Sequence, residues 1–181
     1  MITYIALLRG INVSGKNILK MADLKQLFVD LGFSNVTTYI QSGNIIFMSQ
    51  ETNIAAIETQ IFEGIKQLFG YSVKVLIITN KQLKIVYTSN LFLLRESIDI
   101  TKLHVTFLKG NYCLDEIKNL EKLISTTNEE FKIIANWAYL YLPNGAGKAK
   151  LTNNLFEKKL KTTATSRNWR TITKLVELSD L

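Results

Sequence analysis

The order in which strand-like and helix-like segments follow one another constrains this chain more than any single motif. An apolar run at residues 2–8 is typical of a strand buried on both faces, and apolar residues with helical spacing follow at 21–31. Two strands, a helix and a fourth strand are predicted next, at 35–40, 44–49, 52–70 and 73–78. Strand, helix, strand, strand, helix, strand is the order of the split βαβ motif of the ferredoxin-like fold.

The same order begins again in the second half of the chain. After a connecting helix near 80–89, the predicted elements are a strand, a helix, a hairpin and two helices, at 102–109, 115–124, 130–135 with 137–142, 152–161 and 167–179. Leu8-Arg9-Gly10 ends the first strand, and Leu108-Lys109-Gly110 ends its counterpart. We therefore expect an α+β fold of two ferredoxin-like (βαββαβ-type) halves with antiparallel sheets, plus a C-terminal helix.

The expected domain organisation follows from this repeat. Residues 1–80 should form a first subdomain, 81–100 a helical connector and 101–181 a second subdomain. The connector contains the apolar run Leu91-Phe92-Leu93-Leu94, which we expect to be packed between the subdomains. With 47% hydrophobic residues among 181, the chain can form two cores of roughly 80 to 90 residues each.

Charge and cysteine content narrow the class of partner and the compartment. Twenty-two basic against 15 acidic residues give a net charge of +7, which favours phosphate-bearing or nucleic-acid partners, although a charge of this size also serves solubility. The single cysteine, Cys113, excludes an internal disulfide and fits a reducing compartment. The apolar start has no basic region before it, so we expect no signal peptide, no membrane partner and a cytoplasmic location.

Three polar blocks interrupt the apolar pattern. The first polar block is residues 9–17 (RGINVSGKN), the second is 41–44 (QSGN) and the third is 165–171 (TSRNWRT). They are rich in amide, hydroxyl and guanidinium groups, and none of them contains an acidic residue. Such groups hold anions, so the blocks predict an anion-binding site without identifying its ligand or any reaction.

Topology predicts that the first two blocks are neighbours. In a split βαβ unit the first two strands are parallel and the third returns antiparallel, so the loop after the first strand and the turn between the next two share one end of the sheet. The first block also runs toward the start of the helix at 21–31, whose free N–H groups favour an anion. It is not a Walker loop, because Asn17 stands where the metal-binding hydroxyl would follow Lys16.

Ordinary turn chemistry is the alternative explanation for these blocks. Asn and Ser side chains bond their own backbone in turns, and Gly supplies positive φ. This alternative explains Gly43 and Asn44 well. It leaves unexplained why Arg9, Lys16 and Lys20 gather before a helix start, where positive charge is unfavourable.

The third block is predicted to open the last helix. There Arg167, Arg170 and Lys174 would fall at i, i+3 and i+7 and form one cationic stripe, with Trp169 on the apolar side. We expect Arg167 and Arg170 to reach the first polar block across the two halves, so that an anion lies between them. The alternative is a solvated helix face with Trp169 as a core anchor.

Catalytic and metal-binding groups are scarce. His104, the only histidine, lies on the polar face of its strand, and Cys113 is followed by two acidic residues that would not activate a thiol. No metal site, nucleophilic triad or cofactor site is predicted, and no catalytic residue is identified. A glycine-rich basic loop at 144–151 precedes another helix, and its alternative role is a mobile connection.

Four separated motifs carry a resemblance to a known family. They are Leu7-Leu8-Arg9-Gly10-Ile11-Asn12-Val13-x-Gly15-Lys16, Met21-Ala22-Asp23-Leu24, Tyr39-Ile40-Gln41-Ser42-Gly43-Asn44 and Arg167-Asn168-Trp169-Arg170-Thr171. With them the chain resembles the bacterial family catalogued as domain of unknown function 1697, over nearly its whole length. The resemblance implies a cytosolic α+β protein with duplicated ferredoxin-like halves and implies no activity. The chain departs from the family pattern at Ser14, Ala149 and Ser166, and Ala149 removes a hydroxyl from the 144–151 loop.

Our leading functional hypothesis is binding, with enzymatic processing left open, of a small phosphate- or carboxylate-bearing ligand in a cleft between the subdomains. Arg9 and Lys16 would be the charge partners. The other ligand-binding candidates are Asn12, Gln41, Ser42, Asn44, Arg167, Asn168, Arg170 and Thr171. The oligomeric state is not predicted.

The alternative is a protein that binds single-stranded nucleic acid. In this hypothesis the cationic stripe contacts the phosphate backbone of the nucleic acid. Trp137, Tyr139 and Tyr141, which share one strand face, form a platform on which the bases stack. A structural role of these aromatic residues between the two sheets is the competing explanation. A pure protein-interaction module is a third hypothesis.

Overall fold

The computed structural model describes residues 1–13 and 15–180, which form two compact units. Unit 1 comprises Met1–Ile85 and the segment from Leu175 onward, and unit 2 comprises Val86–Lys174. The segment expected as a connector, 81–100, therefore divides between the units, and the end of the chain returns to unit 1. No helix in the described part of the chain is long and apolar enough to cross a membrane.

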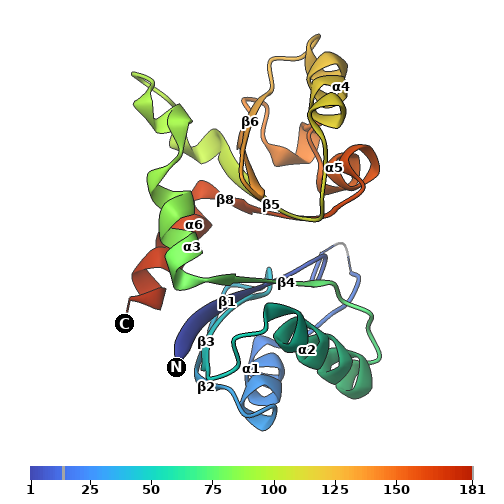
Figure 1. The fold of residues 1–181 in the computed structure, drawn as a ribbon, viewed down its shortest axis with the longest axis vertical. Coiled ribbons are helices and arrows are strands. Elements are labelled where there is room, and N and C mark those ends of the chain that lie inside the picture. Colours follow the sequence, from blue (N-terminus) through green and yellow to red (C-terminus); the bar gives the residue numbers. More distant parts are fainter. Residues whose placement is uncertain (14, 181) are drawn as a thin grey trace. The chain divides into compact units, whose positions relative to one another are not determined.

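Unit 1 has the predicted split βαβ topology. Its elements are β1 (Ile2–Leu8), α1 (Met21–Asp30), β2 (Ser34–Tyr39), β3 (Asn44–Ser49), α2 (Ile54–Phe69) and β4 (Val75–Thr79). The strands lie in the order β2-β3-β1-β4, and each neighbouring pair is antiparallel. Helices α1 and α2 lie on one side of the sheet (Figure 1). The sheet order and the two parallel but non-adjacent strands β1 and β2 confirm the ferredoxin-like prediction.

The core of unit 1 lies between this sheet and its two helices. Alternate residues of β1, Tyr4, Ala6 and Leu8, point into it and pack with Phe28 of α1 and Ile61 of α2. The helix α2 begins at the N-cap Asn53, whose side chain accepts the N–H groups of two following residues, rather than at the predicted Thr52.

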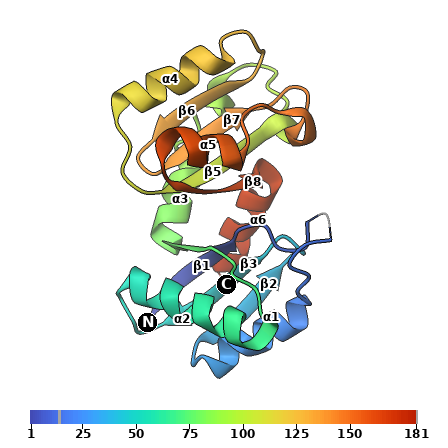
Figure 2. The same ribbon diagram turned by 90° about the vertical axis from the view of Figure 1, so that its right-hand side faces the viewer.

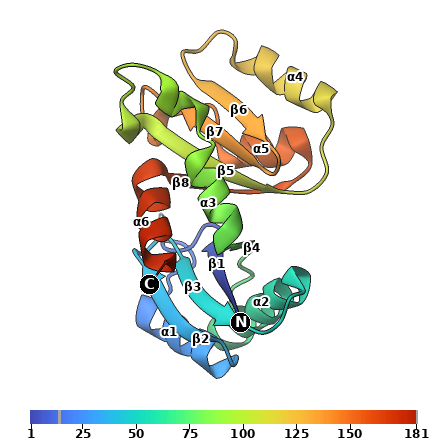
Figure 3. The same ribbon diagram turned by 60° about the vertical axis from the view of Figure 1, so that its left-hand side comes forward.

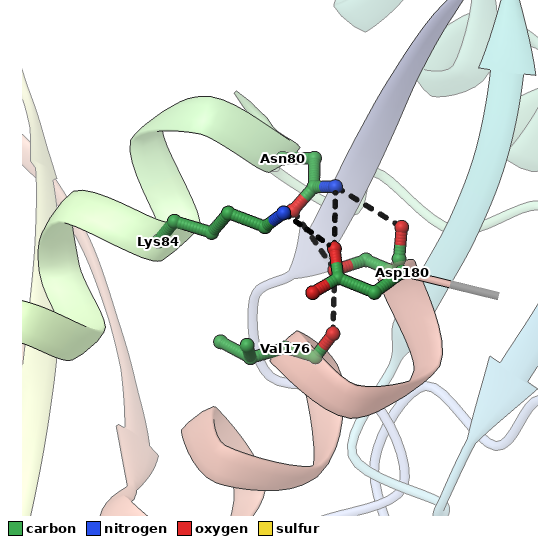
Figure 4. Close-up of polar contacts among 5 residues, drawn as sticks. Asn80, Lys84, Val176 and Asp180 are labelled. Atoms are coloured by element: carbon green, nitrogen blue, oxygen red, sulfur yellow. Dashed lines mark hydrogen bonds and ion pairs between the residues drawn. The ribbon is translucent and has the colours of Figure 1, made fainter.

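The end of the chain is fixed to the start of α3 (Asn80–Thr88) within unit 1 (Figure 4). Asn80 Nδ2 donates to the Ser179 carbonyl oxygen at 3.0 Å and to Asp180 Oδ1 at 3.2 Å. Lys84 Nζ lies 2.7 Å from Asp180 Oδ1. The hydrogen bonds from Lys84 and Asn80 lower the pKa of the Asp180 carboxyl. These contacts hold the end of α6 (Trp169–Ser179) beside α3, as Figure 3 shows.

Unit 2 repeats the same sheet order. Its elements are β5 (Leu103–Lys109), α4 (Leu114–Ile124), β6 (Glu130–Ile134), β7 (Trp137–Tyr141), α5 (Asn153–Leu160) and β8 (Thr163–Asn168). The strands lie in the order β6-β7-β5-β8, again antiparallel throughout. Helices α4 and α5 cover one face (Figure 2), where Leu108, Leu140 and Phe156 are buried in one cluster.

One sequence expectation for unit 2 was wrong. Residues 163–168 form strand β8, whereas the last helix was predicted to begin near 167; it begins at Trp169. The strand lacks an apolar run because its buried positions hold Ala164, Thr165 and Arg167, so hydrophobic patterning does not reveal it. The apolar connector run forms a short 3-10 helix, Leu91–Leu94, in which Phe92 is buried while Leu94 is 81% exposed.

Candidate functional site

The first and second polar blocks meet at one end of the unit 1 sheet, as the topology predicted. Leu7 pairs with Asn44 in the β1–β3 register, and the Leu8 N–H donates to the Gly43 carbonyl oxygen at 2.9 Å. The loop that follows β1 and the turn that joins β2 to β3 are therefore in direct contact. Neither block contains Asp, Glu, His or Cys, so their side chains supply hydrogen-bond groups and cations.

Asn12 joins the two blocks. Its Nδ2 donates to the carbonyl oxygens of Leu19 and Gln41, both at 2.9 Å, and its Oδ1 accepts the Leu19 N–H at 2.8 Å. Asn12 has a φ of +53°, a left-handed conformation that Asn adopts more readily than most residues. Both the Nδ2 and the Oδ1 atoms of the Asn12 side chain have backbone hydrogen-bond partners. Asn12 therefore holds the loop in place, and we assign ligand contacts to its neighbours.

Two further amides stabilise the same loop and turn. Asn17 Nδ2 donates to the Gly10 carbonyl oxygen at 3.0 Å. Asn44, which is fully buried, donates through Nδ2 to the Tyr39 carbonyl oxygen and to Ser42 Oγ, both at 3.0 Å. These are the turn contacts that the alternative explanation predicted for Asn and Ser. Asn44 and Ser42 therefore act on the shape of the turn, and the exposed Gln41 presents its amide to solvent.

The length of the first loop is the feature that turn chemistry does not explain. In unit 1 the connection from β1 to α1 takes twelve residues, 9–20. In unit 2 the equivalent connection from β5 to α4 takes four residues, 110–113. Since both units have the same topology, joining this strand to this helix does not require a long loop. The additional residues include Lys16 and Lys20, both exposed.

Arg9 lies at the base of this loop. Its backbone N–H donates to the Lys74 carbonyl oxygen at 3.0 Å, just before β4 begins, and its side chain is half-buried. The bridge between Val13 and Lys16 closes the tip of the loop, and Asn12 N–H donates to the Asn17 carbonyl oxygen at 3.2 Å. The cations Arg9 and Lys16 are thus carried by a loop whose backbone is internally bonded. Ser14, where the chain departs from the family pattern, lies outside the described residues.

The third polar block lies in unit 2 and is divided between a strand and a helix. Arg167 belongs to β8, opposite Val105 of β5, and only 7% of it is exposed. Its Nη1 donates to Thr165 Oγ1 at 3.0 Å and to the Ser166 carbonyl oxygen at 2.8 Å, and burial lowers the pKa of the guanidinium to about 10. The predicted helical stripe of Arg167, Arg170 and Lys174 is therefore wrong, because Arg167 precedes the helix.

The rest of the third block builds the start of α6. Asn168 Oδ1 accepts the Thr171 N–H at 2.8 Å, which is an N-cap interaction. Trp169 is 5% exposed and stacks on Tyr87 with ring centroids 5.5 Å apart, as the core-anchor alternative predicted. Thr171 is also buried, whereas Arg170 is exposed. The expectation that Arg170 shares a ligand with the first polar block stays a prediction.

The glycine-rich loop at 144–151 already has an internal anion. The Glu129 carboxylate, 8% exposed, accepts the N–H groups of Lys150 at 2.7 Å and of Leu151 at 2.8 Å. Two consecutive backbone N–H groups of this kind are a common feature of phosphate sites. Here a side chain of the same unit occupies them, so this loop is stabilised by Glu129 and is not a candidate for phosphate.

The aromatic face of β7 is covered. Trp137 is 7% exposed and Tyr139 is fully buried, with its hydroxyl donating to the Val86 carbonyl oxygen at 2.9 Å. Burial raises the pKa of Tyr139 to about 12. Tyr141 lies beside Phe92, with ring centroids 6.4 Å apart. A stacking platform must be open to solvent, so the burial of Trp137 and Tyr139 counts against this role for the strand face.

The remaining candidates have structural surroundings. His104 is half-buried, and burial lowers the pKa of its imidazole. Cys113 is exposed and precedes α4, and its backbone N–H donates to Glu116 Oε2 at 2.9 Å. Among the residues that the structure describes, no group of three or more His, Cys, Asp or Glu side chains could hold a metal ion.

A groove in unit 1 was not indicated by any motif. It has a volume of about 740 Å³ and lies over part of the outer sheet face and around the edge strand β2. Its lining consists of Thr3, Lys25, Val29, Asn35, Val36, Thr37, Ile46, Met48, Leu178, Ser179 and Asp180. None of these residues belongs to the polar blocks. They are scattered over five elements and the chain end, so no local spacing in the sequence could have revealed them.

Two sheets with the order β2-β3-β1-β4 and β6-β7-β5-β8, each with two helices on one face, define an α+β protein built of two ferredoxin-like units. The chain belongs to the family described as protein of unknown function (DUF1697), whose family model matches residues 1–139. This membership confirms the resemblance seen in the sequence.

Among solved structures, the chain is similar to the conserved bacterial protein SP0830 from Streptococcus pneumoniae. The two share 21% sequence identity, the match covers 98% of each chain, and the TM-score is 0.74. This likeness shows the fold alone. No curated protein matches the chain.

Proposed function

We propose that unit 1 binds a small phosphate- or carboxylate-bearing molecule at the first polar block, beside the second. The observation that carries this proposal is the twelve-residue loop 9–20, which is internally bonded, carries cations and replaces a connection that takes four residues in unit 2. Hydrogen bonds that order a loop before binding reduce the entropy that the loop loses on binding, so its charges can contribute more to affinity.

In this proposal Arg9 and Lys16 are the charge partners of the ligand, and the exposed amide of Gln41 donates a hydrogen bond to it. Asn12, Ser42 and Asn44 position these groups through the contacts that fix the loop and the turn. Because the two blocks contain no Asp, Glu, His or Cys, the site offers electrostatic stabilisation and no side-chain base. Ligand binding is therefore the function that we propose. The cytoplasmic location expected from the sequence stays a prediction.

The nucleic-acid alternative lacks two of the features that motivated it. Trp137 and Tyr139 are buried, and Arg167 is buried in β8 and bonded to residues of its own strand. The net charge of +7 remains, but it does not distinguish nucleic acid from a small anion.

The test is thermal unfolding of the full chain with inorganic phosphate, pyrophosphate, ribose 5-phosphate and citrate, at constant ionic strength. A ligand at about 100 times its Kd should stabilise the wild type by about 2.7 kcal/mol. Arg9→Ala and Lys16→Gln should reduce this shift. Lys158→Gln, which removes an exposed cation of α5 in unit 2, should leave it unchanged. The proposal fails if no anion stabilises the wild type, or if the three variants respond alike.

A further inference from the structure

The loop and turn of unit 1 expose three β-branched apolar side chains. Val13 is 57% exposed, Ile18 is 64% exposed and Ile40 is 48% exposed. A single exposed apolar residue on a protein surface needs no explanation. These three, however, stand in and beside the first two polar blocks, where Lys16 and Gln41 are also exposed.

Each of the three residues is next in the chain to Asn12 or to one of its hydrogen-bond partners, a group that we call the Asn12 junction. Val13 follows Asn12, Ile18 precedes Leu19, and Ile40 precedes Gln41, and Asn12 is hydrogen-bonded to both Leu19 and Gln41. Consecutive Cα atoms are about 3.8 Å apart, so each apolar residue starts one residue away from the Asn12 junction. Its hydrogen bonds therefore place three segments that expose apolar surface around a single point.

The backbone at Ile40 is strained. Its φ is +48°, which is unusual for any residue with a Cβ and an outlier for a β-branched one. Asn and Gly adopt this conformation more easily and are common in turns. Strained backbone of this kind persists where the surrounding structure holds it and is found often at ligand sites. The turn thus retains an exposed isoleucine at a position where Asn or Gly would be easier to accommodate.

We propose that the ligand of this site joins its anionic group to an apolar or planar part, and that Val13, Ile18 and Ile40 contact that part. The inference rests on the proposed function, because it assigns the second half of the same ligand. Lys16 is bridged to Val13 across the loop tip, so a cation and an apolar side chain are presented by paired residues. An alkyl or aryl phosphate, a nucleoside monophosphate and an apolar carboxylate all have this chemistry.

The connection between the first strand and the first helix of a unit does not require exposed aliphatic side chains. In unit 2 the equivalent loop is Gly110-Asn111-Tyr112-Cys113, which contains no aliphatic β-branched residue. Tyr112 there is half-buried, and its hydroxyl donates to the Ala135 carbonyl oxygen. The same connection can therefore be made without exposed aliphatic side chains, and the presence of Val13 and Ile18 is specific to the long loop of unit 1.

A homologous series of ligands tests the inference. Binding of methyl, ethyl and butyl phosphate, and of acetate, butyrate and hexanoate, is measured by isothermal titration calorimetry on the full chain. Complete burial of a methylene raises affinity about fourfold, and partial burial about twofold. Butyl phosphate should therefore bind about tenfold more tightly than methyl phosphate. Adenosine monophosphate compared with ribose 5-phosphate distinguishes a planar from an aliphatic apolar part.

Matched variants locate the effect. Ile18→Ser should remove most of the chain-length dependence while leaving the affinity for methyl phosphate within about twofold. Ile100→Ser, at a similarly exposed isoleucine of unit 2, should change neither. If inorganic phosphate and methyl phosphate bind but longer chains and adenosine monophosphate bind no more tightly, the inference is overturned and the proposed function stands. If no phosphate or carboxylate binds, the proposed function itself fails. Binding to vesicles of anionic lipid without binding of butyl phosphate would also overturn the inference, in favour of a membrane surface.

Discussion

Asn12 Nδ2 lies 2.9 Å from the carbonyl oxygen of Gln41, and this one contact joins segments that are 29 residues apart in the chain. The same amide group bonds both the N–H and the C=O of Leu19, so Asn12 also closes its own loop. One side chain thus fixes the loop 9–20 on itself and on the turn between β2 and β3. The ligand-binding candidates Lys16 and Gln41 lie on the two segments that this amide joins.

Replacement of Asn12 should destabilise unit 1 and loosen the loop. Asn12→Gly removes the three side-chain hydrogen bonds while tolerating the positive φ, and we expect a loss of about 1–3 kcal/mol. Asn12→Ala should lose about 1 kcal/mol more, because Ala is unfavourable in the left-handed conformation. Urea denaturation measures both, and hydrogen exchange of the Leu19 N–H reports the loop.

Asn111→Ala is the control for Asn12, because this exposed Asn lies in the equivalent loop of unit 2. It should change stability by less than about 0.5 kcal/mol. Equal effects at Asn12 and Asn111 would show that the amide contacts contribute nothing measurable. Faster exchange at Leu19 without a change in global stability would instead limit the role of Asn12 to the loop.

Glu129 should be important for the stability of unit 2. Its carboxylate accepts the N–H groups of both Lys150 and Leu151, and Glu129→Gln replaces one acceptor oxygen by an amide group that cannot accept. We expect a loss of about 1–3 kcal/mol of unfolding free energy. Glu121→Gln, at an exposed position of α4, should be close to neutral. A neutral result at Glu129 in chemical denaturation would contradict the assigned role.

The pH dependence of stability should contain a contribution from His104. Burial lowers the pKa of its imidazole in the folded protein, so between that pKa and the unfolded value of about 6.5 the unfolded chain binds more protons. The contribution of His104 to the unfolding free energy is therefore fully present above about pH 6.5 and is lost as the pH falls through this range. His104→Gln should remove this component.

The His104 component is measured as the difference in unfolding free energy between wild type and His104→Gln from pH 8 to pH 5. Carboxylates such as Asp180, whose pKa is also lowered, titrate in both proteins and cancel in the difference. The wild type should lose stability relative to the variant as the pH falls. A difference that does not vary with pH would show that burial does not affect the titration of His104.

The apolar strands and helices of both units could be predicted because their residues carry periodic patterns. β1 is a continuous apolar run, and its alternate residues Tyr4, Ala6 and Leu8 contribute to the core. β8 could not be predicted in this way, since its buried positions are filled by Thr165 and Arg167 and its pairing with β5 is non-local. The threonines of β8 favour a strand, but the segment has no hydrophobic signature.

The meeting of the first two polar blocks was predicted from topology alone, because strand direction fixes which loops share a sheet end. The roles of individual amides were not. Asn12, Asn17 and Gln41 look alike in a sequence, and only the structure shows that the first two bond the backbone while Gln41 is exposed. Glu129 was missed for a similar reason, because it lies 21 residues from the N–H group of Lys150 that it binds.

Gly43 should tolerate no side chain, and Gly70 provides the matched comparison. Both have nearly the same left-handed φ, +75° and +77°, so alanine is equally unfavourable in the backbone at either position. A Cβ at Gly43 would lie 2.7 Å from Ile11 Cδ1 and 2.8 Å from Leu8 Cβ, whereas a Cβ at Gly70 meets nothing within 4 Å. Gly70→Ala should cost about 1–2 kcal/mol from backbone conformation alone. Gly43→Ala should cost about 1–3 kcal/mol more, because Leu8 and Ile11 are buried and must move.

Urea denaturation of the two variants measures this difference in unfolding free energy directly. The Gly43 carbonyl oxygen also accepts the Leu8 N–H at 2.9 Å, so displacement of Gly43 would move the turn away from the loop that follows β1. Gly43→Ala should therefore weaken anion binding, whereas Gly70→Ala should leave it intact. Equal destabilisation by the two substitutions would show that the turn and the loop are not tightly packed, and the site would then lose its structural basis.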